Sequence, residues 1–580
     1  MKSFLQRRAV LGLIASSVLA ACKPSSTKPS GNASTDASVK QAESSLTNHW
    51  RAAKQLTSSM FQYGIASGDP AADSVVIWTH VNANAPALVD WEVSLSPDFK
   101  ELVSHGQVTT DAEQDFTVKA IPANLKSGTA YYYRFKFANT LSPVGRTKTL
   151  PVGSLNQYGI ALASCSNYAF GFFNAYDAIA NDSKVDLVLH TGDYIYEYGA
   201  DGWGAETAQQ IGRVHEPAHE IVSLADYRAR HAQYKTDQGS LAMHATHPMV
   251  CCWDDHETAN NPWIGGAQNH QADTEGEWAD RRSASVRAYY EWMPIRDPHT
   301  LDERLAFSRA YRIGDLANLV TLETRHTARA EQIDYLKYFE GIQSMADAER
   351  FTQDVIAEPG RRMLSSETEA LVQQEFAPTE GTMQPWHLLG SASPIARMLV
   401  PDVLSMGVLD GEPPEQMESF AAQALVWKGK YNMPFYTDTW DGYPWARQRF
   451  YEACQSVSAT DLVFLTGDSH SFWINKISDD SGVAMGVELG TAGISSPGDF
   501  VESGWSRPVA EKLDRLFESQ LDEVIWTDNL NQGYVRLDLG REQAEASFVA
   551  VSTVLEPNYT SRVIKRSVIQ RNDNALQFAT

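Results

Sequence analysis

The sequence is poor in cysteine and in long apolar runs. Its 580 residues contain five cysteines, too few and too irregularly placed for a disulfide framework. One apolar stretch, residues 9–21, stands near the N-terminus and is too short to span a bilayer. These absences exclude a disulfide scaffold and a multi-span membrane protein.

Positive charge is also in short supply. The chain has 48 Lys and Arg against 72 Asp and Glu, a formal net charge of -24. Because a phosphate backbone needs a basic footprint, we expect no nucleic-acid-binding module. An acidic surface is compatible with divalent cations, although it is usually a solvated face. The length favours two domains and a tether.

The N-terminus has the features of an export signal. Arg7 and Arg8 precede the apolar stretch and resemble a twin-arginine signal, and Leu19–Cys22 resembles a bacterial lipobox. We expect residues 1–22 to be a twin-arginine-type lipoprotein signal peptide with Cys22 lipidated. The alternative is a plain cleavable signal with an incidental cysteine. Residues 23–58, rich in Ser, Thr, Ala and Lys, have the composition of a flexible linker.

Composition and periodicity divide the remainder of the chain. Short strands separated by turn residues over 59–151 predict a small all-β sandwich of the fibronectin-III or Ig-like kind. From residue 152 to 555 strands alternate with helices, which predicts an α/β (α+β) sheet sandwich with flanking helices. We expect a helical insertion at about 330–427 and a polar C-terminal tail over 556–580.

Four short apolar runs each end on residues that bind metals. Such runs are typical of strands buried on both faces, and ligands bind beyond the carboxyl ends of such strands. We therefore expect a metal site assembled from four loops. The runs and the residues that follow them are Tyr158–Ala163 with Cys165, Val185–Thr191 with Asp193 and Tyr196, Pro248–Trp253 with Asp254, Asp255 and His256, and Leu462–Thr466 with Asp468 and His470.

The ligand types indicate two different cations. Thiolate and phenolate are strong donors to Fe³⁺, so Cys165 and Tyr196 favour iron, and Asp193 can bridge two cations. The oxygen donors of Asp254, Asp255 and Asp468 suit Ca²⁺, with Mn²⁺, Mg²⁺ or Zn²⁺ as options. His256 can protonate a leaving alkoxide. A lone cysteine at a strand end is more often a core residue, but the joint occurrence favours the metal site.

Several motifs together resemble the PhoD-like alkaline phosphatases of the calcineurin-like metallophosphoesterase superfamily. They include residues 190–197 (HTGDYIYE), 253–261 (WDDHETANN) and 466–470 (TGDSH). The resemblance implies an extracytoplasmic phosphatase or phosphodiesterase with Fe³⁺ and Ca²⁺, in which a metal-activated hydroxide attacks the phosphate ester. Cys165, Asp193 and Tyr196 match the family's iron ligands. The remaining ligands match Asp254, Asp255, Asp468 and His470.

Two departures from the family pattern concern the substrate side. Ser164-Cys165-Ser166 replaces the Asp-x-His opening of the wider superfamily, as is expected for PhoD-like proteins. Glu323 stands where the family more often has Asp. Arg325 and Arg296 are candidate phosphate-binding residues, although each is more often a structural salt-bridge partner.

The sequence thus predicts a monomeric, lipid-anchored enzyme of the bacterial periplasm or cell envelope. Its substrates would be small-molecule or polymeric phosphate esters, and the anchor would be its only membrane contact. One alternative is a phospholipase- or teichoic-acid-type phosphodiesterase of the same fold. The other is a non-catalytic surface-binding lipoprotein, which the intact ligand set disfavours.

Overall fold

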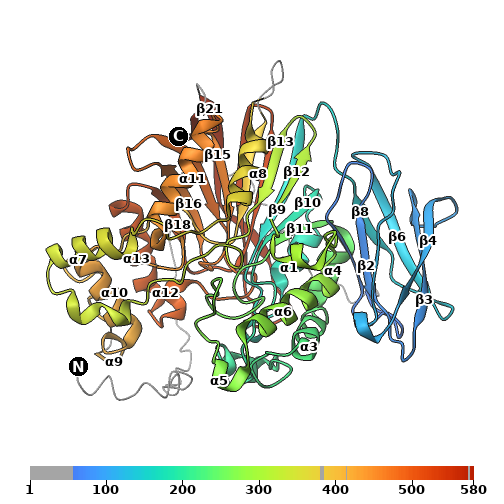
Figure 1. Cartoon of the computed structure of the whole chain (residues 1–580), viewed down its shortest axis with the longest axis horizontal. Helices are drawn as coiled ribbons and strands as arrows, with labels where there is room; N and C mark the ends of the chain where they lie inside the picture. Colours follow the sequence, from blue (N-terminus) through green and yellow to red (C-terminus); the bar gives the residue numbers. More distant parts are fainter. Residues whose placement is uncertain (1–55, 379–384, 413, 573–574, 580) are drawn as a thin grey trace, which may run out of the picture.

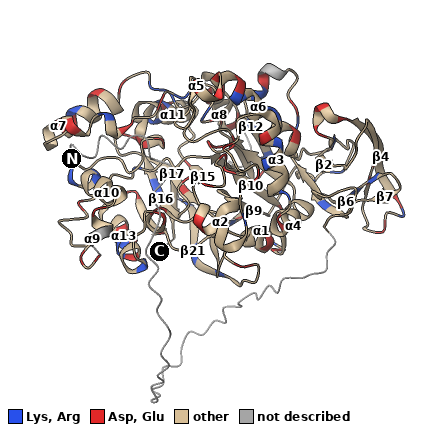
Figure 2. Cartoon of the chain, turned by 90° about the horizontal axis from the view of Figure 1, so that it is seen from below, with Lys and Arg blue, Asp and Glu red and all other residues tan. Residues whose placement is uncertain are grey.

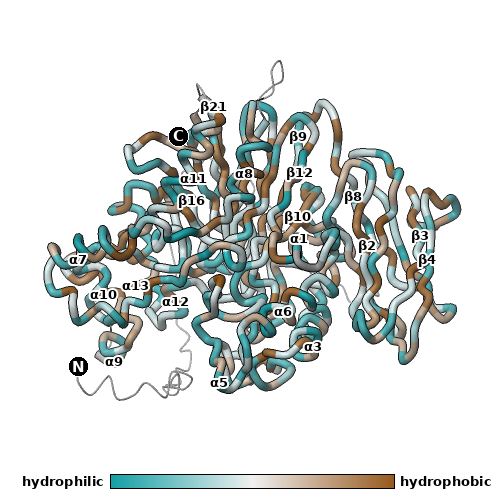
Figure 3. Tube along the Cα trace, in the orientation of Figure 1, coloured by the Kyte–Doolittle hydropathy of each residue, from teal (hydrophilic) through white to brown (hydrophobic). Residues whose placement is uncertain are grey.

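The structure, a computed structural model, describes residues 56–378, 385–412, 414–572 and 575–579. Two large sheets lie face to face with helices on both outer sides (Figure 1). Apolar segments run through the strands, whereas the outer helices carry many hydrophilic residues (Figure 3). The predicted signal peptide with Cys22, and almost all of the predicted linker, lie outside the described residues.

The first sheet has ten strands. Its centre is the parallel trio β9, β10 and β11, whose apolar residues are buried on both faces. The strands, in sheet order, are β22 (Ala575–Phe578), β21 (Ser561–Asn572), β20 (Gln543–Val551), β19 (Gly533–Gly540), β9 (Gln157–Ala163), β10 (Leu187–Thr191), β11 (Met249–Cys252), β1 (Ile65–Gly68), β2 (Val76–His80) and β5 (Thr117–Ala120).

The second sheet has seven strands and packs on the first through an apolar layer that both sheets supply. Leu162 and Leu189 of the first sheet meet Leu388 and Leu465 of the second in this layer. In sheet order the strands are β12 (Arg309–Ile313), β13 (Ala317–Thr321), β14 (Trp386–Ser391), β15 (Leu462–Thr466), β17 (Ala484–Gly490), β16 (Phe472–Ser478) and β18 (Val524–Asp528).

Helices cover both outer faces. The ten-stranded sheet is covered by α1 (Asn174–Ala180), α3 (Leu224–Tyr234), α4 (Gln238–Thr246) and α6 (Trp278–Trp292). The seven-stranded sheet is covered by α8 (Ser366–Phe376), α10 (Phe420–Lys430), α11 (Pro444–Ser456) and α13 (Arg507–Gln520). Shorter helices are α2 (Ala205–Ile211), α5 (Ala272–Glu275), α7 (Met345–Phe351), α9 (Pro414–Met417) and α12 (Asp499–Glu502). Local signals start several of them, for example the capping box from Ser223 to Asp226 before α3.

The N-terminal part is a two-layered β structure. β3 (Ala87–Ser94), β4 (Leu102–Thr110), β6 (Ala130–Phe137), β7 (Thr140–Leu141) and β8 (Gly145–Lys148) form one layer. The other layer consists of β1, β2 and β5, and the apolar core between the layers includes Val89, Val118 and Tyr133. β1 also pairs with β11 through one position, Gly68 with Met249, so the second layer continues the ten-stranded sheet.

Two segments differ from the sequence expectation. Residues 330–427 are not simply a helical insertion, because β14 lies inside them and pairs in parallel with both β13 and β15. The polar segment 556–580 contains β21 and β22, which extend the ten-stranded sheet.

Within the part of the chain that the structure describes, no helix is long and apolar enough to cross a membrane. Acidic and basic residues are interspersed over the outer helices (Figure 2).

Candidate metal centre

The loops that follow β9, β10, β11 and β15 converge at one end of the two sheets. Three of these loops contain non-glycine residues whose backbone φ lies in the left-handed region. A residue other than glycine adopts this conformation at a cost of about 1–2 kcal/mol. Strain of this kind collects at functional sites. The residues are Cys165 (φ 59°), Asp193 (φ 56°), Asp468 (φ 66°) and His470 (φ 54°).

The first side-chain group consists of Cys165, Asp193 and His470. Their ligand atoms all lie within 4.8 Å of one another, and all three residues are buried. Tyr196 joins them, because its Oη donates to Asp193 Oδ2 at 2.9 Å and lies 3.3 Å from His470 Nε2. The structure therefore brings together the three residues predicted to bind iron and adds the predicted ligand His470.

The second group consists of Asp254, Asp255 and Asp468, whose ligand atoms also lie within 4.8 Å of one another. Asp193, Asp255 and His256 form a further group that links the two. Asp254 Oδ2 and Asp255 Oδ1 are buried and have no hydrogen-bond partner within the described part of the chain. Unpaired buried carboxylate oxygens are costly in an apolar surrounding. Acceptors of this kind fit a bound cation, as does the thiol, phenol and carboxylate donor set.

Burial and mutual repulsion raise the pKa values of several acidic groups of the centre. Burial, and then the charges of Asp255 and Asp254, hold the pKa of Asp193 well above its usual range, although His256 opposes the shift. Burial raises the pKa of Asp254 to about 6 against the opposing charge of Arg325. Burial, and then the charge of Asp193, raises the pKa of the Cys165 thiol. A cation bound among these groups would favour their ionised forms.

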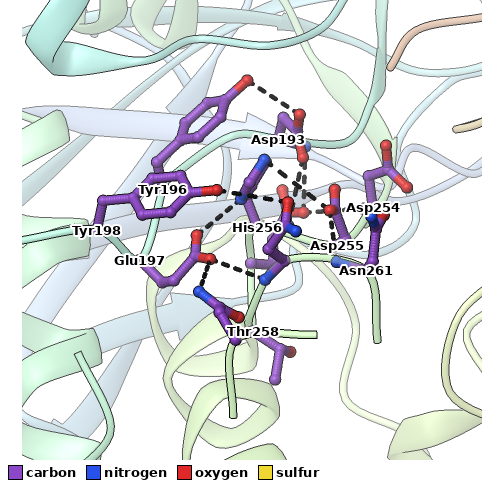
Figure 4. Close-up of polar contacts among 12 residues, drawn as sticks. Asp193, Tyr196, Glu197, Tyr198, Asp254, Asp255, His256, Thr258 and Asn261 are labelled. Atoms are coloured by element: carbon purple, nitrogen blue, oxygen red, sulfur yellow. Dashed lines mark hydrogen bonds and ion pairs between the residues drawn. The ribbon is translucent and has the colours of Figure 1, made fainter. Parts of the chain in front are cut away.

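His256 is held by a carboxylate that the sequence analysis did not single out. Its Nδ1 lies 2.7 Å from Glu197 Oε2, and its Nε2 lies 3.9 Å from Asp255 Oδ2 (Figure 4). Burial alone would lower the pKa of His256, but the negative charges of Asp255, Glu197 and Asp193 outweigh burial and raise it well above its usual value. The contact with Glu197 therefore fixes the ring orientation and places a carboxylate against Nδ1.

Glu257 is a second residue whose role the sequence did not reveal. Its Oε2 accepts hydrogen bonds from the backbone N–H groups of Asp193 (3.1 Å) and Asp254 (2.8 Å). Its Oε1 accepts a hydrogen bond from the backbone N–H of Tyr194 (2.6 Å). One buried carboxylate thus ties the loop after β10 to the loop after β11. Glu197 is the last residue of the 190–197 motif and Glu257 lies within the 253–261 motif, and these positions were the available signal.

Other residues near the centre have different roles. The Trp203 ring stacks on the rings of His470 and His256 and forms an aromatic wall. The backbone N–H of Asn261 donates to Asp255 Oδ2 at 2.9 Å. Arg296 lies elsewhere, since it binds Asp69 and Ser74 in the N-terminal part, which agrees with a structural role. His470 also lies near two carboxylates of α12, Asp499 and Glu502.

Known proteins are similar to this chain over most of its length. Residues 160–548 match the family model of PhoD-like phosphatases, and residues 45–151 match that of the PhoD-like phosphatase N-terminal domain. Alkaline phosphatase D of Bacillus subtilis (strain 168) is 31% identical over 545 residues, which cover 91% of this chain and 83% of that protein. The solved structure of PhoD matches with a TM-score of 0.72 at 28% identity and covers 90% of this chain and 92% of that one.

Proposed function

The chain belongs to the PhoD-like phosphatase family and is a phosphoric ester hydrolase, and from this premise we propose a metal-dependent phosphatase with Fe³⁺ at one position and Ca²⁺ at the other. The observation that carries the proposal is the convergence of two ligand groups, all buried except the partly exposed Asp468, at the ends of strands from both sheets. Membership of the family supports the metal dependence.

The donor types support different metals at the two positions. Cys165, Asp193, Tyr196 and His470 would hold Fe³⁺, because thiolate and phenolate favour a trivalent iron. Asp254, Asp255 and Asp468 would hold Ca²⁺, with Mn²⁺, Mg²⁺ or Zn²⁺ as alternatives. When bound, such cations neutralise phosphate oxygens and lower the pKa of a coordinated water.

His256 is the residue that we propose as general acid. Glu197 holds Nδ1, which leaves Nε2 to face the carboxylates of the centre. The contact of Glu197 with Nδ1 stabilises the protonated imidazole, and the proton that it would give is the one on Nε2. Donation from Nε2 to the leaving alkoxide oxygen would prevent a strong base from departing unprotonated.

The location of the enzyme follows from the N-terminal motifs. We propose export by the twin-arginine-type signal and lipid anchoring of Cys22 at the periplasmic side of a bacterial membrane. In a Cys22→Ser variant the protein should move from the membrane fraction to the soluble periplasmic fraction. A wild-type protein already in the soluble fraction would contradict the anchor.

The type of phosphate ester separates the main proposal from its alternative. A phospholipase- or teichoic-acid-type phosphodiesterase would prefer diesters, whereas a phosphatase prefers monoesters. We would compare p-nitrophenyl phosphate with bis-p-nitrophenyl phosphate, with and without Ca²⁺, on protein whose bound iron has been quantified. Hydrolysis that depends on Ca²⁺ together with bound iron would support the proposed centre.

Cys165→Ala is the variant that tests the centre, and Cys454→Ala is its matched control. Both cysteines are buried, but Cys454 lies in α11 against the outer core. Loss of a ligand should lower activity at least about 100-fold and release iron, because even indirect partners of a metal cost about 10- to 100-fold. Absence of iron and of turnover in the wild type would refute the proposal and favour the non-catalytic binding protein.

A further inference from the structure

Arg325 presents buried donors without a partner. The residue is 0% exposed, and Nη1 and Nη2 make no hydrogen bond to any residue that the structure describes. Among the described residues its only hydrogen bond runs from Nε to Asp254 Oδ1 at 2.5 Å. A buried charged donor without a hydrogen bond carries a large desolvation cost. Two such donors on one side chain therefore indicate that a ligand supplies the acceptor.

Nη2, at the outer end of the Arg325 side chain, lies at the second group of carboxylates. Nη2 is 3.8 Å from Asp255 Oδ1 and 3.7 Å from Asp468 Oδ1. These distances are too long for hydrogen bonds, although the opposite charges still attract. Nη2 thus lies beside the ligand group in ion-pair contact with it, but without a hydrogen bond to it.

Arg281 shows what a structural buried arginine looks like in this protein. It is as deeply buried, but each of its nitrogens has an acceptor. Nε donates to Tyr227 Oη (3.2 Å), Nη1 to Glu275 Oε2 (2.8 Å) and Nη2 to Glu220 Oε1 (2.7 Å). The contrast argues that the ends of Arg325 are kept for a ligand.

We propose that Arg325 binds the phosphoryl group of the substrate through Nη1 and Nη2. The planar guanidinium matches two phosphate oxygens, and such pairs are charge-assisted and directional. A cation position beside an arginine is also a common clamp on a phosphoryl group. The inference rests on the proposed function, because it takes the ester to bind at the same centre. Free phosphate, as the product, should bind to the same donors.

Glu323 is the positioning residue for this arginine. Its Oε1 accepts from the backbone N–H groups of Arg325 (2.8 Å) and His326 (2.7 Å) and from Trp253 Nε1 (3.1 Å). Its Oε2 accepts from the backbone N–H and the hydroxyl of Thr327. Glu323 thereby holds the loop after β13 against the motif after β11. The shorter Asp that the family more often has would not reach all of these donors in the same geometry.

The test measures phosphate binding directly by calorimetry on the full chain with its bound metals, together with kcat, KM and metal content. The variants are Arg325→Lys, Arg325→Gln and Glu323→Asp, with Arg281→Lys as the control. Arg325→Lys should weaken phosphate binding and raise KM by about 10- to 100-fold, because Lys cannot reproduce the two-pronged contact. Glu323→Asp should shift both values in the same direction by less. Arg281→Lys should shift neither.

Each outcome decides the proposal. Unchanged phosphate affinity in Arg325→Lys, with altered metal content, would make Arg325 a counter-ion of the carboxylates and overturn it. Equal losses of affinity in Arg325→Lys and Arg281→Lys would overturn it as well, since the effect would then be structural. A wild type that binds phosphate but hydrolyses no ester would contradict the proposed function only. If Arg325→Gln does not fold, Arg325→Lys and Glu323→Asp still decide.

Discussion

Glu257 shows how a residue with no proposed contact to substrate can control the centre. Three backbone N–H groups converge on its carboxylate, and the residue is 3% exposed. In Glu257→Gln the amide nitrogen would face at least one of these donors. We expect a loss of stability of about 1–3 kcal/mol, the cost of a buried donor left unpaired, and lower metal content.

Urea denaturation and metal analysis check this prediction. Glu375→Gln is the control, because Glu375 is a buried glutamate that binds the side chain of Arg312 instead of the backbone of a ligand loop. The control should retain its metals. Equal metal content in Glu257→Gln and the wild type would show that the ligand loops hold their geometry without this carboxylate.

At this scale the sequence pointed to the candidate ligands but not to the residues that hold them in place. Cys165, Asp193 and Asp468 stand at fixed places after apolar runs, so their convergence was predictable from the pattern of strands. The partners of Glu197 and Glu257 come from other loops, and only the tertiary structure determines them. The unpaired ends of Arg325 are invisible to any sequence pattern for the same reason.

The C-terminal end of α3 places a lysine in an unfavourable position. Lys235 follows the helix, is 2% exposed, and its Nζ donates to Tyr194 Oη at 3.0 Å. Burial lowers its pKa from 10.5 to about 7, although the thiol of Cys251 opposes the shift. Between these two values the unfolded chain binds more protons than the folded chain. Stability should therefore rise with pH over this window.

Lys235→Met should remove this pH dependence. The stability difference between wild type and variant should shift by about 3–5 kcal/mol in favour of the wild type from pH 7 to pH 10.5. Urea denaturation at several pH values measures it. Lys476→Met, on β16 at an exposed position, is the matched control. Parallel pH curves for wild type and Lys235→Met would mean that Lys235 is charged in the folded state at neutral pH.

Strands that are buried on both faces of a sheet were predictable from the sequence. β9, β10, β11 and β15 are short apolar runs and were expected as strands. β14 was not predicted, because its six residues stand alone between helices and its neighbours β13 and β15 are distant in the sequence. β21 reads as polar because it lies near the edge of its sheet, where few of its side chains are fully buried.

At the scale of the whole molecule, the C-terminal strands complete the larger sheet. β21 pairs with β20 from Gln543 to Val551, and Ile569 and Leu576 enter the core between the two sheets. A chain that ends at residue 560 should lose at least about 3 kcal/mol, because two large apolar side chains leave the core. It would also expose β20 as an edge strand, so we expect aggregation.

Thermal unfolding and size-exclusion chromatography check the truncation. A chain that ends at residue 579 is the control and should behave as the full chain does. An equally stable, monodisperse chain ending at residue 560 would show that β21 and β22 contribute little to the sheet.

The centre brings together candidate ligands that lie far apart in the catalytic part of the chain. Cys165 follows β9, the first strand of that part, whereas His470 follows β15, after all of the helices from α1 to α11. Contacts between residues so distant in the sequence form late in folding, because the entropy of loop closure opposes them until the intervening structure has formed. A tightly held cation is therefore a signature of complete folding. A substitution in a distant helix or strand that delays the docking of β15 should therefore lower the metal content of the protein before it changes other properties.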